Sequence, residues 1–240
     1  MGHYSAKRGF SDSVRELIQK LVSVTRLLWE STRKTLLPSP AKFHYLFNMR
    51  ELSRIWQGML GTLSTVIESE NSAMMLWMHE CTRVLTDRFS DPKDKVWFDS
   101  EMDNLVRQEL GEAHVKMLGC RTSLFVDFMR DAPEPTGEEG EDADVELPKV
   151  YEPIEDLDIL KERLVMFLAQ YNDIVRGSPM NLVFFPDAMI NLVKISRIIR
   201  CPGGNALLVG VGGSGKQSLT KLSSFIAGYK TFQITLSRLV

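Results

Sequence analysis

Apolar residues at helical spacing dominate the first part of the chain and predict a series of amphipathic helices. The first is expected to open at Ser13-x-x-Glu16, which has the spacing of a capping box. Its apolar positions recur every three or four residues over 14–28, and the helix is expected to end before Pro38. Short connections between such helices favour a small helical bundle.

Three further helices continue this pattern. Asn48-x-x-Glu51 is a second capping-box sequence and predicts the start of another helix. A third helix carries Met and Trp residues on its apolar face over 74–85 and is expected to end before Asp91, while a fourth is expected to start near Ser100. Met and Trp at this spacing indicate a packed core rather than a ligand cage.

The pattern changes in the second part of the chain. A long helix is predicted over 157–175, and Pro186 suits the first turn of the next helix. A short strand at 206–209, a glycine-rich turn, a helix over 219–226 and a second strand at 231–236 follow. This order is the opening of a P-loop α/β domain, whose buried sheet needs further parallel strands. The predicted fold class is therefore mainly α, with an incomplete α/β part.

An acidic segment separates these two parts. Residues 131–146, DAPEPTGEEGEDADVE, hold eight acidic residues, no basic residue, two prolines and two glycines. Such a segment buries too little apolar surface to offset the entropy of ordering it, which predicts an exposed linker or loop insertion. An acidic docking site for a basic partner is the alternative interpretation.

Composition excludes several classes of function. The 240 residues are 44% hydrophobic and 25% charged, with a net charge of -2, so we expect neither a nucleic-acid partner nor an anionic membrane surface. No apolar run approaches the roughly 20 residues that span a bilayer. Three widely spaced cysteines indicate a reducing compartment without a disulfide framework, and four scattered histidines predict no metal site.

The stretch LLVGVGGSGKQS, at 207–218, carries the most specific chemistry. It follows the phosphate-binding pattern G-x-x-x-x-G-K-[ST] except at its last position. Glycines let the backbone aim N–H groups at phosphate oxygens, and Lys216 is expected to reach the β- and γ-phosphates. The alternative is a glycine-rich turn with an exposed lysine. The predicted phosphate-binding residues are Gly210, Val211, Gly212, Gly213, Ser214, Gly215, Lys216, Gln217 and Ser218.

Gln217 stands where a Ser or Thr hydroxyl would coordinate Mg²⁺. Ser218 is one helical step further, about 100° away from the metal position. ATP or ADP is therefore the expected ligand, while Mg²⁺ coordination is left open. No apolar run ending in acidic residues follows the loop, so we predict no catalytic residue and expect the chain by itself to bind nucleotide weakly, without turnover.

The loop and its flanks resemble an axonemal dynein heavy chain. Residues 201–229 are similar to the phosphate loop of the fourth AAA+ module in that family, where Gln-Ser after the lysine is a regular feature. Residues 181–200 resemble the segment before that loop, whose start packs on adenine in the family. The resemblance thus nominates Val183 and Phe184 as adenine contacts; apolar core is the alternative for both.

A second resemblance lies upstream, in LLPSPAKFHYLFNMRELSRIWQGML at 36–60. This stretch is similar to the helical small subdomain of the third AAA+ module, with the family pattern F-x-Y-x-F-N-x-R-[DE]-[LM]-[ST] starting at Phe43. The arginine of that pattern, Arg50 here, is of the sensor-2 type, which reaches the γ-phosphate of its own module's nucleotide. A solvated arginine in the first turn of a helix is the alternative.

The resemblance implies a domain order and a parent protein. Residues 1–130 would be the helical end of the third module, 131–149 an acidic linker, and 150–240 the first strands and helices of the fourth. The parent would be an ATP-driven, minus-end-directed microtubule motor of the cytoplasm, cytoskeleton and ciliary or flagellar axoneme. Its expected partners are the rest of the heavy-chain ring, the microtubule, and dynein intermediate and light chains.

Two other functions remain open from the sequence. A stand-alone P-loop NTPase or kinase would turn nucleotide over as the purified chain. A non-catalytic helical docking chain would show no change in melting temperature with Mg-ATP, whereas a binder at 100 times its Kd gains about 2.7 kcal/mol.

Overall fold

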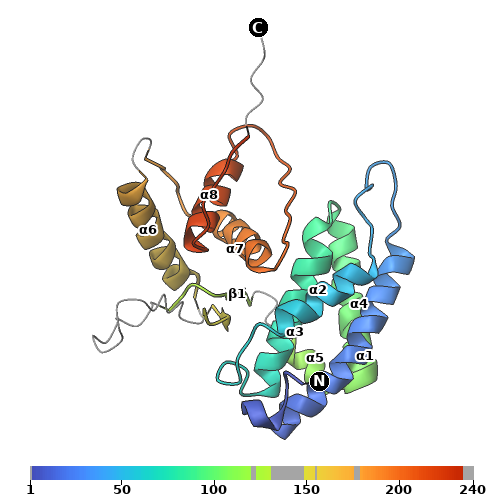
Figure 1. Cartoon of the computed structure of the whole chain (residues 1–240). Coiled ribbons are helices and arrows are strands. Elements are labelled where there is room, and N and C mark those ends of the chain that lie inside the picture. The colour runs from blue at the N-terminus through green and yellow to red at the C-terminus, as the bar shows by residue number, and fades with distance from the viewer. Residues whose placement is uncertain (1, 120–122, 131–148, 155, 176–178, 235–240) are drawn as a thin grey trace, which may run out of the picture. The chain divides into compact units, whose positions relative to one another are not determined.

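The computed structural model describes residues 2–119, 123–130, 149–154, 156–175 and 179–234 (Figure 1). The acidic segment 131–146 and the end of the predicted strand 231–236 lie outside these residues. The chain divides into two compact units, Met1–Phe125 with Lys149–Pro153 and Val126–Pro148 with Ile154–Val240. Their assignment to the third and fourth AAA+ modules stays a prediction.

Helices make up nearly all of the regular structure in both units, as predicted. The first unit contains the 3₁₀ turns η1 (Ala6–Arg8) and η2 (Thr86–Arg88) and the helices α1 (Asp12–Thr35), α2 (Met49–Met59), α3 (Glu70–Leu85), α4 (Pro92–Leu110) and α5 (Glu112–Met117). The second contains α6 (Leu157–Ile174), α7 (Pro186–Arg200) and α8 (Lys216–Ile226). Strands β1 (Phe125–Val126) and β2 (Glu152–Pro153) pair in a two-stranded sheet.

Two of the predicted helix starts are wrong. Ser11, not Ser13, is the N-cap of α1, and its Oγ accepts a hydrogen bond from the Val14 amide at 3.4 Å. The fourth helix begins at Pro92 rather than near Ser100, because Asp91 caps it and proline occupies its first position. Proline fits there because its missing N–H would have had no intrahelical partner. The capping box of Asn48 and Glu51 is confirmed.

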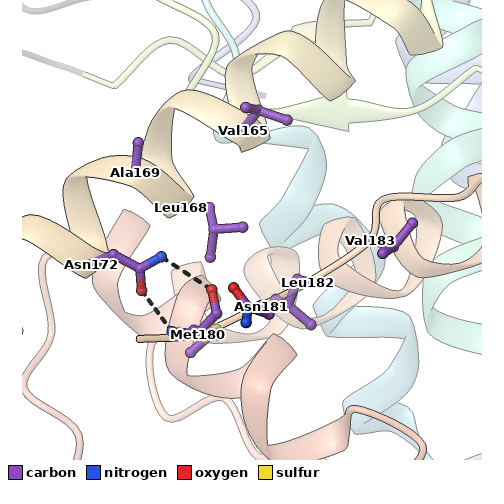
Figure 2. A pocket seen from close by; sticks show the side chains of 8 residues that line it. All are labelled: Val165, Leu168, Ala169, Asn172, Met180, Asn181, Leu182 and Val183. Atoms are coloured by element: carbon purple, nitrogen blue, oxygen red, sulfur yellow. Dashed lines mark hydrogen bonds between the residues drawn. The ribbon is translucent and has the colours of Figure 1, made fainter. Parts of the chain in front are cut away.

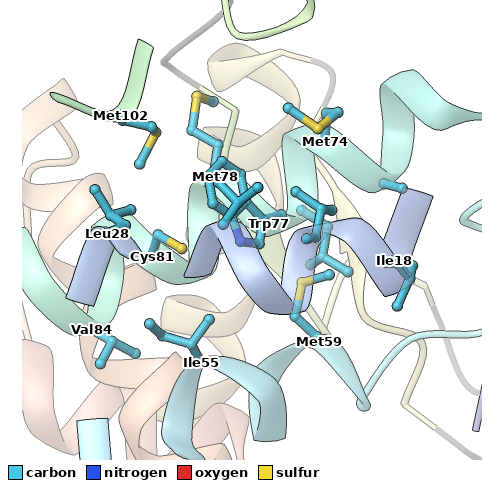
Figure 3. Packing of buried hydrophobic residues seen from close by; sticks show 14 of the residues in the cluster. Ile18, Leu28, Ile55, Met59, Met74, Trp77, Met78, Cys81, Val84 and Met102 are labelled. Atoms are coloured by element: carbon cyan, nitrogen blue, oxygen red, sulfur yellow. The ribbon is translucent and has the colours of Figure 1, made fainter. Parts of the chain in front are cut away.

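The core of the first unit lies between α1, α2, α3 and α4 (Figure 3). Trp77 of α3 is fully buried, and its Nε1 donates to Thr25 Oγ1 of α1 at 2.8 Å. Met74, Met78 and Cys81 are buried around it, which confirms that the Met and Trp residues of this helix form core. A buried indole needs such a partner for its N–H, so Thr25 and Trp77 fix the packing of α1 on α3.

A buried polar cluster joins α2 and α3. Tyr151 Oη donates to Glu80 Oε1 at 2.7 Å, and Glu80 is fully buried. Gly58 packs directly against this carboxyl group, since a Cβ at position 58 would lie 1.8 Å from Glu80 Oε2. Tyr4 Oη donates to the Met59 carbonyl at 2.6 Å, and burial together with the charge of Glu80 raises the pKa of Tyr4 to about 12. The α2–α3 contact therefore depends on a residue without a side chain at position 58.

Neither strand predicted beside the glycine loop is formed within the described residues, which end at 234. Residues 206–209 and 231–234 pair with no other strand among the described residues, and Leu207 and Val209 are 80% and 86% exposed. A strand is stabilised by hydrogen bonds to neighbouring strands, and β1 with β2 is the single ladder within the described ranges. No helix in the described part of the chain is both long and apolar enough to cross a bilayer.

Candidate nucleotide-binding site

The glycine-rich loop ends at the N-terminus of α8. Gly213 and Gly215 have φ of 77° and 76°, a left-handed conformation that favours glycine, and α8 starts immediately afterwards at Lys216. The first turn of α8 carries no acidic residue. Because a helix leaves its first N–H groups without intrahelical partners and carries partial positive charge at this end, the geometry suits a phosphate group.

Lys216 folds back into this loop. Its Nζ donates to the carbonyls of Gly210 at 2.8 Å and Val211 at 2.7 Å, and to Ser214 Oγ at 2.9 Å. A Cβ at position 210 would lie 3.2 Å from Ser214 Oγ and 3.5 Å from Lys216 Nζ, so a side chain there would fit only tightly against these two groups. The ammonium group is thus placed where the loop's carbonyls and hydroxyl converge.

The two residues after Lys216 differ in their surroundings. Gln217 is exposed and Ser218 is half-buried. Thr220 Oγ1 donates to the Lys216 carbonyl at 2.8 Å, so this hydroxyl is bonded to the backbone of its own helix. Across the described residues no group of three His, Cys, Asp or Glu side chains could hold a metal ion.

The segment before α7 lines a cavity of about 430 Å³ against α6 (Figure 2). Asn172 holds this segment, because its Oδ1 accepts from the Met180 amide at 2.7 Å and its Nδ2 donates to the Met180 carbonyl at 3.1 Å. Asn172 could not be predicted from the sequence, since one polar residue on a helix carries no distinguishing pattern. The lining residues are Val165, Leu168, Ala169, Asn172, Met180, Asn181, Leu182 and Val183.

The structure separates the two residues nominated for adenine. Val183 is 81% exposed and lines the cavity, whereas Phe184 is 5% exposed and does not. Phe184 lies two residues before the start of α7 and is buried. Of the two residues, Val183 alone has a surface that a ligand could reach.

Arg50 lies in the first turn of α2, in the first unit. Its side chain is exposed and makes no hydrogen bond or ion pair with any residue that the structure describes. The neighbouring Glu51 is buried, and its Oε2 accepts from the Asn48 amide at 2.8 Å. Tyr45 and Phe47 of the same motif are also buried. The motif therefore buries Tyr45, Phe47 and Glu51, whereas Phe43 is exposed and the guanidinium of Arg50 is left available.

Comparison with known families gives a match for each of the two parts of the chain. Residues 180–239 match the family described as the P-loop containing dynein motor region D4, and residues 21–112 match the AAA+ lid domain. The second match covers α2, α3 and α4, and the first covers α7, the glycine loop and α8.

Individual relatives match nearly the whole chain. Dynein axonemal heavy chain 5 of Mus musculus is 58% identical over 238 residues, which are 99% of this chain and 5% of that protein. Dynein axonemal heavy chain 8 of Homo sapiens is 50% identical over 237 residues, with the same two shares. The Dynein-1-alpha heavy chain of the flagellar inner arm I1 complex of Chlamydomonas reinhardtii is 40% identical over 229 residues, 95% of this chain and 5% of that protein. The chain thus belongs to the axonemal dynein heavy-chain family, and it spans a small part of the length of these relatives.

Proposed function

We propose that residues 210–218 bind ATP or ADP within a dynein heavy chain, as the phosphate-binding loop of the fourth AAA+ module. The observation that carries this proposal is the position of Lys216 Nζ, which is held by three oxygen atoms of the loop at the start of α8. The match of this region to dynein motor region D4 supports it. Residues 150–240 are accordingly assigned to the fourth module.

The loop binds the phosphates of the nucleotide with two kinds of group. The backbone N–H groups at the start of α8 donate to phosphate oxygens, and Lys216 neutralises their charge. Ser214 supplies a hydroxyl that accepts from Lys216 Nζ at 2.9 Å and so lies next to the ammonium group. If Mg²⁺ accompanies the nucleotide, it would neutralise part of the phosphate charge, and the amide oxygen of Gln217 would stand where the phosphate-loop pattern has a hydroxyl ligand.

The nucleotide at this loop acts as a regulatory ligand of the motor. It biases the module between open and closed states to the extent that its affinity for the two states differs. The parent heavy chain is proposed to be a minus-end-directed microtubule motor of the ciliary or flagellar axoneme. Its partners are then the remaining modules of its ring, the microtubule, and intermediate and light chains.

Arg50 is proposed to act on a different nucleotide. Its exposed guanidinium in the first turn of α2 is free to contact the γ-phosphate in the third module, to which residues 1–130 are assigned. Residues 131–149 would link the two modules. The match of residues 21–112 to an AAA+ lid domain supports this assignment.

Substitution of Lys216 in the heavy chain carrying this segment tests the proposed loop. Lys216→Ala is expected to lower nucleotide occupancy at the fourth module, because the phosphate charge loses its neutralising group. Lys221→Ala is the matched control, since Lys221 lies on α8 outside the loop. Unchanged occupancy with Lys216→Ala would overturn the proposal, and nucleotide turnover by the isolated 240-residue chain would favour a stand-alone NTPase or kinase.

A further inference from the structure

Arg88 connects three points around the turn that carries Arg50. Its Nη1 donates to the Leu46 carbonyl at 2.9 Å, and its Nη2 donates to Glu51 Oε1 at 3.3 Å. Its guanidinium carbon also lies 5.4 Å from the centre of the Phe47 ring. Arg88 thus contacts the chain both before and after Arg50.

The two carboxylate oxygens of Glu51 have different partners. One oxygen, Oε2, accepts from the Asn48 amide and completes the N-terminal cap of α2. The other oxygen, Oε1, pairs with Arg88. Both side chains of this pair are largely buried, with 26% of Arg88 and 9% of Glu51 exposed. Water therefore screens the attraction between them less than it would at the surface. The first turn of α2 is therefore held from the α3 side.

The chain before this turn is fastened to the start of α4 and, through His44 Nε2, to the Arg88 carbonyl at 2.8 Å. Tyr45 Oη donates to Asp94 Oδ2 at 2.7 Å, and Lys42 Nζ donates to the same oxygen at 2.6 Å. These bonds hold residues 42–45, whereas the side-chain bonds of Arg88 reach Leu46 and Glu51. Trp29 Nε1 also donates to the Asn48 carbonyl at 3.1 Å, and Arg88 adds contacts on both sides of position 50.

We propose that Arg88 is a positioning residue, which holds the first turn of α2 so that Arg50 is presented to the γ-phosphate of a nucleotide. This inference rests on the proposed role of Arg50. Arginine suits the task because its planar fork reaches two acceptors at once, here a carbonyl and a carboxylate on either side of the turn. The side chain of Arg50 itself is left without a partner among the described residues, so its orientation depends on the backbone that Arg88 holds.

A double-mutant cycle in the heavy chain carrying this segment tests the coupling. The quantity measured is the ratio of the affinities for ATPγS and ADP, from displacement of a fluorescent ADP, with Lys216→Ala in every variant so that the loop at 210–218 contributes little. Arg50→Ala is expected to lower this ratio about tenfold, the effect of losing one charge-assisted hydrogen bond. Arg88→Gln is expected to lower the affinity ratio at least about threefold, which lies within the range of interaction energies between neighbouring residues. In a chain that already carries Arg50→Ala, Arg88→Gln is expected to have no further effect on the ratio.

Arg83→Gln is the matched control. Arg83 lies on α3, and its Nη2 pairs with Asp87 at 3.3 Å, the same distance as the pair of Arg88 and Glu51. Among the described residues it has no hydrogen bond or ion pair with residues 46–51. It is expected to leave the ratio unchanged. Should Arg88→Gln prevent folding, Glu51→Gln makes the same test, because it keeps an oxygen for the cap and loses the ion pair.

The possible outcomes separate the two proposals. If Arg50→Ala lowers the ratio while Arg88→Gln and Glu51→Gln do not, the positioning role is overturned and the role of Arg50 stands. An equal effect of Arg88→Gln with and without Arg50 also overturns it, because Arg88 then acts on its own. If Arg50→Ala leaves the ratio unchanged, the proposed role of Arg50 fails, and the positioning role fails with it.

Discussion

Replacement of Gly58 by alanine has two effects on stability, and they have opposite signs. In a helix, alanine is favoured over glycine by about 1 kcal/mol, which alone would stabilise α2. The structure places the new Cβ 1.8 Å from Glu80 Oε2, which is far inside contact distance. Overpacking of this kind costs about 1–3 kcal/mol, and displacing Glu80 from Tyr151 Oη costs about another 1–3 kcal/mol. The net expectation is a loss of about 3 kcal/mol in the free energy of unfolding.

Tryptophan fluorescence measures this loss in the first unit alone. The chain has four tryptophans, and all of them, Trp29, Trp56, Trp77 and Trp97, lie in that unit. Gly58→Ala should lower the unfolding midpoint temperature by about 10 °C, given the usual relation between the two quantities for a domain of this size.

Two companion variants establish the cause of this change. Gln57→Ala, at an exposed position of the same helix, should change the free energy of unfolding by less than about 0.5 kcal/mol. In a Glu80→Ala background the colliding carboxyl is absent, so Gly58→Ala should cost little or become stabilising. A midpoint for Gly58→Ala equal to or above that of the unmodified chain would refute the steric argument.

Three further changes test other buried contacts. Because the pKa of Tyr4 is raised to about 12, the unfolded state ionises first as pH rises above about 10; the free energy of unfolding should then fall by about 2–3 kcal/mol toward pH 12, and Tyr4→Phe should remove that fall in urea titrations. Thr25→Val leaves the Trp77 N–H without its acceptor and should cost about 1–3 kcal/mol in thermal unfolding, whereas Thr25→Ser, which keeps the hydroxyl, should cost less. Asn172→Ala removes both hydrogen bonds to Met180, so the Met180 amide should exchange its hydrogen about tenfold faster or more; unchanged exchange would contradict the role given to Asn172.

The helices and the glycine loop could be predicted from the sequence because the residues that determine them are close together along the chain. The pair of Asn48 and Glu51 was predicted from its spacing alone, and Gly213 and Gly215 adopt the left-handed conformation that a phosphate loop uses. The start of α4 was missed because Asp91-Pro92 was interpreted as an end, although proline is favoured in the first turn of a helix.

What the sequence could not supply depends on residues distant along the chain. The apolar run at 206–209 has the composition of a strand, but a strand also needs neighbours to bond, and the described residues provide none for it. The contacts of Arg88 with Leu46 and Glu51 span 42 and 37 positions and follow no spacing rule. Likewise, Val183 and Phe184 are adjacent and apolar, and only packing distinguishes the exposed residue from the buried one.

The pairing of β1 with β2 bears on how this protein can be labelled. The ladder joins Phe125–Val126 to Glu152–Pro153, and Tyr151 beside it is bonded to Glu80, so the two ends of the intervening segment are already held together by the fold. Closing a loop costs free energy that grows only with the logarithm of its length, and doubling the loop adds about 0.6 kcal/mol. An epitope tag or a small fluorescent domain inserted between these strands should therefore leave both the glycine loop and the turn of Arg50 unchanged.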